Sequence, residues 1–145
     1  MLYTELTRKA MKLAYDAHHG QLDKSGIPYI FHPFHIAEQM KDEYTICAAL
    51  LHDVVEDTNV TLNELETIFP SEVTDAVRLL THNKDNDYLD YVRAIGTNPI
   101  ARTVKLADLR HNSDKSRLDD TKNAPDTVKR LEKYAKAIKL LMESE

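Results

Sequence analysis

Apolar side chains recur at helical spacing along the N-terminal part of the chain. This periodic segment ends before Gly20, a residue type that is favoured just beyond a helix end. The following segment, 21–29, contains Gly26 and Pro28 and is typical of a loop. The pattern therefore predicts a first helix and then a loop. The apolar positions of that helix are Leu2, Leu6, Ala10, Leu13, Ala14 and Ala17.

Two further helices are predicted before residue 56. Pro33 suits the first turn of a helix that has Ile36 and Met40 on one face. The segment from Thr45 to about Val55 is rich in Ala and Leu, and its length favours a buried helix over a strand. Its uninterrupted apolar run, Ile46–Leu51, has only six residues. Because a membrane-spanning helix needs about 20, we expect no transmembrane helix.

The rest of the chain also has a helical pattern. Thr61 and Glu64 have the spacing of a capping box, and Val60 and Leu65 have the spacing of a hydrophobic staple. No segment alternates polar and apolar residues for long enough to support a sheet. The sequence thus predicts an all-α fold, a compact bundle of about seven or eight helices. Further helices are expected at 71–80, at 88–95, at 99–112 behind Asn98, and in a C-terminal stretch with Val128, Leu131, Tyr134, Ile138 and Leu141 on one face.

Length and composition exclude several classes of protein. A chain of 145 residues without a linker-like segment is predicted to form one domain, 1–145. The net charge of −5 and the absence of a basic tract argue against nucleic-acid binding. Cys47 has no second cysteine with which to form an internal disulfide or a thiolate cluster. Charged residues such as Glu5 and Arg8 interrupt the N-terminus, so we expect no secretory signal and a cytoplasmic protein.

Polar residues at the end of the apolar run are the first candidates for chemistry. His52 follows six apolar residues, and on a continuing helix Glu56 lies one turn beyond it, as Asp57 lies one turn beyond Asp53. Such groups cost several kcal/mol to bury unless they are paired or bind a metal. The alternative is a helix end that emerges into water, although its carboxylates would oppose the helix dipole.

Two other segments carry candidate residues. Lys105, Asp108 and Asn112 form a polar stripe at i, i+3 and i+7, a pattern that amphipathic surface helices also show. His32 stands at a helix start within an aromatic and aliphatic patch, where a histidine can equally be a capping or core residue. Residue types alone leave both interpretations open.

Taken in order, these motifs resemble HD-domain phosphohydrolases. The resemblance is to the alarmone hydrolase branch, which comprises the hydrolase half of RelA/SpoT proteins and the small Mesh1-type enzymes. It covers about residues 17 to 112. The matching stretches are Ala17–Gln21, Lys24–Gly26, Pro28–Ile30, His32–Pro33, Leu50–Thr58, Val104–Asp108 and His111–Asn112.

The resemblance implies a metal-dependent active site. Two imidazoles and two carboxylates suit Mn²⁺, Fe²⁺ or Zn²⁺, and the family suggests one divalent ion, manganese. The implied metal ligands are His32, His52, Asp53 and Asp108, and the implied catalytic acidic pair is Glu56 and Asp57.

The resemblance also implies a nucleotide substrate. It is guanosine tetraphosphate or pentaphosphate, (p)ppGpp, from which the 3′-pyrophosphate is removed to leave GDP or GTP. Because the chain has no room for a synthetase or regulatory domain, we expect a stand-alone hydrolase with a small-molecule partner. The implied substrate-binding residues are Lys24, Ser25, Lys105 and Asn112, with Tyr29 as a wall of the pocket.

The sequence departs from the family pattern at two places. Asp23 stands where the family usually has an arginine that can stack on guanine, and Leu109-Arg110 reverses the usual order, which turns the arginine about 100° around the helix. Two alternatives therefore stay open. One is the same chemistry on NADPH or a deoxynucleotide, and the other is a non-catalytic nucleotide sensor that keeps the metal.

Overall fold

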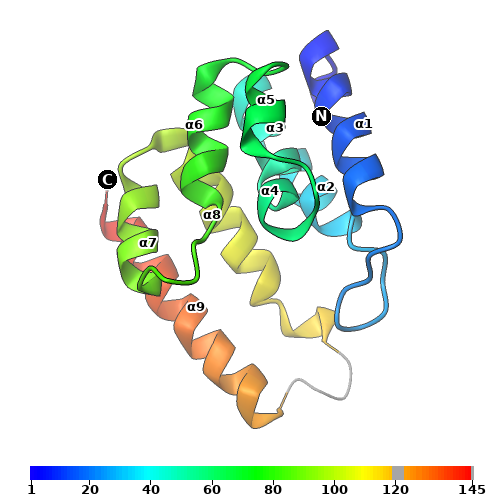
Figure 1. Ribbon diagram of the computed structural model, residues 1–145. Helices are drawn as coiled ribbons and strands as arrows, with labels where there is room; N and C mark the ends of the chain where they lie inside the picture. The colour runs from blue at the N-terminus through cyan, green and yellow to red at the C-terminus, as the bar shows by residue number, and fades with distance from the viewer. Residues whose placement is uncertain (119–122, 145) are drawn as a thin grey trace.

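The computed structural model describes residues 1–118 and 123–144 (Figure 1). Over these ranges the chain is helical and contains no strand beyond an isolated antiparallel bridge between Leu22 and Pro28. The predicted all-α fold is confirmed. The helices are α1 (Glu5–His18), α2 (Phe31–Glu38), α3 (Glu43–Leu51), α4 (Val54–Asp57), α5 (Leu62–Glu66), α6 (Ser71–Leu80), α7 (Tyr88–Gly96), α8 (Pro99–Asn112), the 3₁₀ turn η1 (Lys115–Arg117) and α9 (Pro125–Glu143).

Helix α3 lies at the centre of the core. Asp42 caps it by accepting a hydrogen bond from the amide of Thr45 at 2.9 Å, and every residue from Thr45 to Leu51 is buried. It packs against α1, α2, α6 and α8, which explains why its sequence is apolar on all sides. The end of α3 is therefore held in a fixed place within the molecule.

Helix α8 is the second central element. Asn98 caps it by accepting from the amide of Ala101 at 3.0 Å, and Pro99 occupies the first turn, as predicted. Figure 1 shows α8 between α1 on one side and α7 and α9 on the other, and it packs against α2, α3, α6, α7 and α9. Its buried face includes Val104, Asp108 and Leu109. A carboxylate is thus carried into the interior between α2 and α3.

The structure corrects the prediction of a single helix from Thr45 to about Val55. Helix α3 ends at Leu51, His52 and Asp53 form a turn, and α4 begins at Val54. The Ala49 carbonyl accepts a hydrogen bond from His52 Nδ1 at 2.6 Å. Such a local side-chain bond competes with the backbone bonds that would continue the helix. The two polar residues therefore occupy the bend rather than successive positions of one helix.

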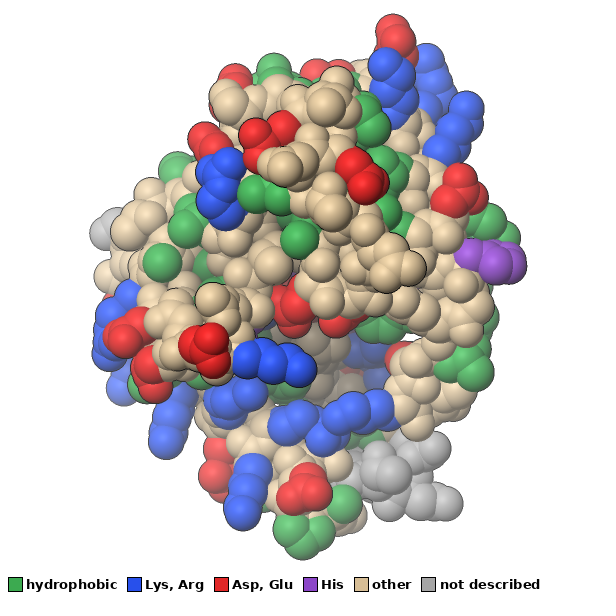
Figure 2. Space-filling model, viewed as in Figure 1, with side chains coloured by type: hydrophobic (Ala, Val, Ile, Leu, Met, Phe, Trp, Pro, Cys, Tyr) green, Lys and Arg blue, Asp and Glu red, His purple; other side chains and the backbone are tan. Residues whose placement is uncertain are grey.

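The remaining predicted helix starts agree with the structure in most details. Thr61 caps α5 by accepting from the amide of Glu64 at 3.2 Å, and Leu65 is buried. Helix α2 begins at Phe31, two residues before Pro33. None of the helices in the described ranges combines the length and apolar character needed to cross a bilayer. In the space-filling view, acidic side chains lie in a hollow at the middle of one face, and Lys and Arg side chains gather beside it (Figure 2).

Candidate metal centre and active site

Four side chains from distant parts of the sequence meet at the centre of the molecule. His32 comes from α2, His52 and Asp53 from the bend between α3 and α4, and Asp108 from α8. One ligand atom from each lies within 4.8 Å of the corresponding atom of every other. His32 Nε2 is 2.8 Å from Asp108 Oδ1, and His52 Nε2 is 3.0 Å from Asp53 Oδ2. The structure therefore brings together the four residues that the resemblance implied as metal ligands.

The state of His52 fits a cation at this cluster. Its Nδ1 donates to the Ala49 carbonyl, so Nε2 is the nitrogen that is free to bind a proton or a metal. Nε2 is buried, faces Asp53 Oδ2 and, at 3.5 Å, Asp108 Oδ1, and has no hydrogen-bond partner among the described residues. Burial alone would lower the pKa of His52, but Asp53 and Asp108 raise it well above its ordinary value. A proton and a divalent ion therefore compete for the same nitrogen.

Asp108 is held ionised by its neighbours on α8. Lys105 Nζ lies 2.9 Å from Asp108 Oδ2, and Asn112 Nδ2 donates to Asp108 Oδ1 at 3.1 Å. Burial would raise the pKa of this carboxyl group, but Lys105, the hydrogen bond from His32 and the charge of His52 hold it well below its ordinary value. The predicted polar stripe is thus a partly buried network centred on Asp108. Lys105 and Asn112, predicted to bind substrate, contact Asp108.

Asp53 and His32 are each oriented by a further side chain. The hydroxyl of Tyr29 donates to Asp53 Oδ2, so the residue predicted as a pocket wall contacts a cluster carboxylate directly. Burial opposes ionisation of Asp53, but His52 and this hydrogen bond lower its pKa to about 2. His32 Nδ1 is 2.7 Å from His111 Nδ1. Burial and the charge of Arg117 lower the pKa of His111 to about 4, so its ring is neutral at pH 7.

The two residues of the acidic pair lie in different settings. Glu56 Oε1 accepts a hydrogen bond from the amide of His82 at 2.7 Å, which ties α4 to the connection between α6 and α7. Asp57 is more open. Burial, together with repulsion from Asp53 and Glu56, raises the pKa of Asp57 to about 6. A carboxylate with such a pKa can take up a proton near neutral pH.

The loop that carries Lys24 and Ser25 is built around Asp23. Asp23 Oδ1 accepts from the amides of Ser25 at 2.8 Å and Ile27 at 3.0 Å, and Asp23 Oδ2 lies 3.7 Å from Arg117 Nη2. The hydroxyl of Ser25 donates to the Arg117 carbonyl at 3.0 Å, so it fastens the loop. Burial and then the charge of Arg130 on α9 lower the pKa of Lys24.

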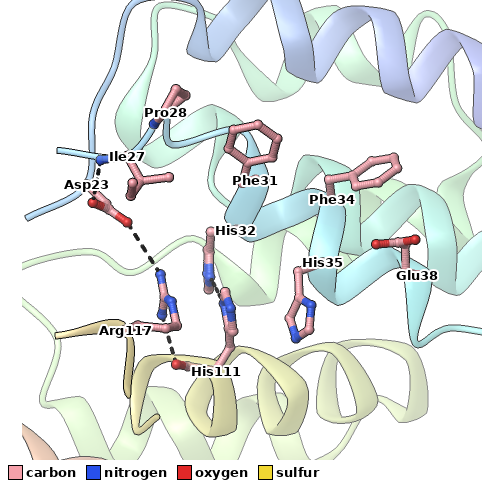
Figure 3. Close-up of a pocket in the computed structure, with 10 residues that line it drawn as sticks. All are labelled: Asp23, Ile27, Pro28, Phe31, His32, Phe34, His35, Glu38, His111 and Arg117. Carbon is pink, nitrogen blue, oxygen red and sulfur yellow. Dashed lines mark hydrogen bonds and ion pairs between the residues drawn. The ribbon is translucent and has the colours of Figure 1, made fainter. Parts of the chain in front are cut away.

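A cavity of about 460 Å³ adjoins the cluster at His32 (Figure 3). The rings of His35 and His111 stack in it with centroids 4.1 Å apart, and Phe31 and Phe34 line its apolar side. Arg117 closes one end, donating to the His111 carbonyl at 2.8 Å. Sequence reasoning assigned no role to His35 or His111, although the spacing of His111 from Asp108 on α8 was the available signal.

Comparison with known proteins agrees with this geometry. The HD domain family matches residues 10–93, which include His32, His52 and Asp53, whereas Asp108 lies beyond the match. The chain belongs to the HD-domain family.

Several relatives of this chain have named activities. The chain is 38% identical over 120 residues to the bifunctional (p)ppGpp synthase/hydrolase SpoT of Escherichia coli K12, and the alignment covers 72% of this chain and 17% of that protein. It is 35% identical to the guanosine-3′,5′-bis(diphosphate) 3′-pyrophosphohydrolase of Spiroplasma citri, covering 72% and 16% respectively. The chain thus spans about a sixth of the length of these relatives. A solved structure of a metazoan ortholog of SpoT that hydrolyses ppGpp matches all of this chain and 90% of its own, with a TM-score of 0.78 and 25% identity.

Tyrosine and lysine side chains of α7, α8 and α9 form a surface of this HD domain that was not predicted from the sequence. Its residues are Tyr88, Tyr91, Lys105 and Lys133. Lys133 Nζ lies 4.4 Å from the ring centroid of Tyr88, and Lys105 Nζ lies 5.4 Å from that of Tyr91. The Tyr88 hydroxyl is buried without a hydrogen-bond partner among the described residues. Because α9 lies outside the stretch that carries the family motifs, the sequence offered only the spacing of the two tyrosines as a signal.

Proposed function

We propose that this HD domain is a metal-dependent (p)ppGpp 3′-pyrophosphohydrolase that leaves GDP or GTP. The observation that carries the proposal is the buried cluster of His32, His52, Asp53 and Asp108 with the carboxylate of Asp57 beside it. The named activities of the relatives support the choice of substrate. We propose that residues 1–145 act as one domain, since α2, the bend between α3 and α4, and α8 all contribute to the cluster and one core extends from α1 to α9.

The four cluster residues would hold one divalent ion, for which we propose Mn²⁺. When bound, such an ion lowers the pKa of water toward neutrality and offsets phosphate charge. The chain's own residues do the rest. Tyr29 and the Ala49 carbonyl orient Asp53 and His52, and Asp57 takes the proton from the attacking water. Glu56 fixes α4 through the His82 amide and adds negative charge beside Asp57, which keeps the pKa of Asp57 high.

Lys and Arg side chains gather beside the acidic hollow and would supply the counter-charge for a polyphosphate (Figure 2). Lys24 from the loop and Lys133 from α9 are the cations that we propose to contact phosphate oxygens, with Lys105 and Asn112 supporting Asp108 from beneath. Ser25 shapes the loop through its bond to Arg117, and Tyr29 bounds the pocket through its bond to Asp53. The proposal thus gives Lys24 a direct contact with phosphate and gives Ser25, Tyr29, Lys105 and Asn112 supporting roles.

A direct assay tests the proposed function. Purified protein loaded with Mn²⁺ is incubated with ppGpp, and the products are separated by anion-exchange chromatography. We expect GDP and pyrophosphate in equal amounts, and no product from Asp53→Ala, which lacks a cluster carboxylate. Absence of pyrophosphate release from the metal-loaded protein would overturn the proposal.

A second candidate is the same hydrolysis on NADPH or a deoxynucleotide. The pairing of Asp23 with Arg117 favours it, because the position that resembles a guanine-stacking arginine holds a carboxylate engaged in shaping its own loop. A competition assay across ppGpp, NADPH and the deoxynucleoside triphosphates separates the candidates by the ratio of their kcat/KM values. Preference for ppGpp eliminates the second candidate, and binding without turnover under several divalent metals identifies a sensor.

Two substitutions should separate metal binding from catalysis. Asp53→Ala should abolish Mn²⁺ binding, because it removes a ligand atom from the cluster. Glu56→Gln keeps an oxygen for the His82 amide and removes only charge, so it should retain the metal and slow turnover about tenfold. Metal content by mass spectrometry and kcat measured on the same samples check both. Loss of metal in both variants would contradict the separate roles.

A further inference from the structure

A buried histidine outside the cluster is connected to the acidic pair by hydrogen bonds. His18 is the last residue of α1 and is only 1% exposed. Its Nδ1 lies 2.9 Å from Gln21 Oε1, and its ring contacts that of Tyr29 with centroids 5.0 Å apart. Gly20, with a φ of 87°, supplies the left-handed turn that brings Gln21 back over His18.

Gln21 connects this histidine to α4. Its Nε2 donates to the main-chain carbonyl of Asp57 at 2.9 Å, across 36 positions of sequence. Helix α4 has only four residues, so it has few internal hydrogen bonds, and its last carbonyls need partners from elsewhere. Among the described residues, Gln21 is the partner that the Asp57 carbonyl receives from outside its own segment. The end of α4 is therefore held by a side chain from the α1–α2 loop.

The direction of each hydrogen bond in this chain can be deduced. A carbonyl oxygen only accepts, so the nitrogen of the Gln21 amide must face Asp57 and the oxygen must face His18. His18 Nδ1 then carries the proton. His18 Nε2 is left as a buried lone pair with no hydrogen-bond partner among the described residues, and burial lowers the pKa of His18, which favours the neutral ring.

We propose that His18 and Gln21 are positioning residues that fix the main chain at Asp57 and so set where its carboxylate stands relative to Asp53. The kinetic consequence rests on the proposed function, whereas the hydrogen-bonded chain does not. Misplacement of a reacting group by about 1 Å can cost on the order of 10²-fold in rate. Loss of an outer hydrogen-bond partner typically costs about 10- to 100-fold.

Gln21→Glu is the sharpest test, because it changes one atom type at nearly constant shape. The new carboxylate still accepts from His18 Nδ1 but cannot donate to the Asp57 carbonyl, and it places oxygen against oxygen there. We expect kcat for ppGpp to fall about 10- to 100-fold. KM and Mn²⁺ affinity should stay close to the parent values, since no cluster residue changes.

Gln39→Glu is the matched control. Gln39 is exposed at the end of α2, also donates its Nε2 to a main-chain carbonyl, that of His35 at 3.3 Å, and undergoes the same change of charge. We expect parent kinetics from this variant. An equal loss of kcat in both glutamate variants, or an unchanged kcat in Gln21→Glu, would overturn the proposal.

Substitutions at His18 provide a rescue experiment. An asparagine amide nitrogen can take the place of Nδ1–H, so His18→Asn should retain most of the parent kcat, whereas His18→Leu should lose as much as Gln21→Glu. Equal activities of the asparagine and leucine variants contradict the role of the Nδ1 proton. If His18→Leu fails to fold, Gln21→Glu and its control still decide the question.

A spectroscopic measurement tests the chain of hydrogen bonds without any turnover. Long-range ¹H–¹⁵N correlation of the imidazole should show His18 protonated on Nδ1 and bare on Nε2 at neutral pH. Amide exchange at Thr58, whose amide bonds within α4, should speed up in Gln21→Glu and not in Gln39→Glu. The opposite tautomer, or unchanged exchange, overturns the positioning role. A parent protein that shows this tautomer but hydrolyses no ppGpp instead contradicts the proposed function.

Discussion

At the scale of single residues, neighbouring charges give three aspartates of the site different properties. His52 and the Tyr29 hydroxyl lower the pKa of Asp53 to about 2 despite its burial, and Lys105 holds the pKa of Asp108 well below the ordinary range. At Asp57 the effect of His52 is smaller than the effects of burial, Asp53 and Glu56, so the pKa of Asp57 is raised to about 6. Two of these side chains are therefore suited to remain charged ligands, and the third is suited to accept a proton.

The raised pKa of Asp57 predicts how the stability of the metal-free protein depends on pH. The folded state holds the proton more tightly than the unfolded chain, whose pKa is near 3.8, so the parent loses stability as pH rises from about 4 to about 6. Asp57→Asn should remove this loss. Because the side chain is partly exposed, we expect a gain on the order of 1 kcal/mol at pH 7.

Urea unfolding in EDTA at pH 4 and pH 7 checks the prediction for Asp57. The gain from Asp57→Asn should be present at pH 7 and absent at pH 4. Asp85→Asn, at an exposed position between α6 and α7, serves as the control for a change of net charge. A gain of the same size at both pH values would refute the electrostatic explanation.

At the scale of elements, the bend at His52–Asp53 decides the geometry of the site. Adjacent residues on a continuing helix project about 100° apart, which would separate the two side chains. The bend instead allows His52 Nε2 and Asp53 Oδ2 to approach to 3.0 Å. The cap at the other end of α3, Asp42, starts this helix at a defined residue and so fixes the distance to the bend.

The cap of α3 gives a prediction at this scale. Asp42→Ala removes the acceptor for the amide and hydroxyl of Thr45 and should lower the free energy of unfolding by about 0.5–2 kcal/mol. Asp42→Ser retains a capping oxygen and should lose much less. Denaturant unfolding at pH 7 compares the two variants with the parent. Equal losses from alanine and serine would show that the cap is not the source of stability.

At the scale of the whole molecule, the cluster joins segments that are far apart in sequence. His32, the His52–Asp53 bend and Asp108 belong to α2, α3–α4 and α8, so an ion bound by all four residues cross-links the centre of the fold. The core that surrounds them is continuous from α1 to α9. Binding at such a place should therefore stabilise the entire folded state.

Metal binding should accordingly raise the melting temperature. An ion that binds only the folded state contributes about 2.7 kcal/mol at a concentration of 100 times its Kd. Adding Mn²⁺ to metal-free protein should raise Tm, EDTA should reverse the shift, and Asp53→Ala should not respond. His19→Ala, which removes an exposed imidazole, should respond like the parent. A Tm that does not change when Mn²⁺ is added would contradict metal binding at the cluster.

Much of the fold followed from local patterns in the sequence. The helix over Pro99–Asn112 was predicted from its cap and proline, and the buried helix α3 from its apolar run. The bend after Leu51 was not predicted, because the spacing of apolar residues does not reveal the hydrogen bond from His52 to the Ala49 carbonyl. The four cluster residues were identified through motifs in the order typical of the family. The contacts of His111 with His32 and of Tyr29 with Asp53 were visible only in the tertiary structure.

The sequence by itself determined which segments are helical and which polar groups stand among apolar residues, because both depend on spacing along one chain. Only the tertiary structure decided three contacts. Asp23 forms an ion pair with Arg117, Glu56 accepts a hydrogen bond from the His82 amide, and Gln21 donates one to the Asp57 carbonyl. Such contacts depend on how helices pack and turn, since a difference of a few ångströms determines whether two polar groups pair, bind an ion or remain in water. The residue types of this site could therefore be identified from the sequence, whereas the contacts between them depend on the packing of the helices.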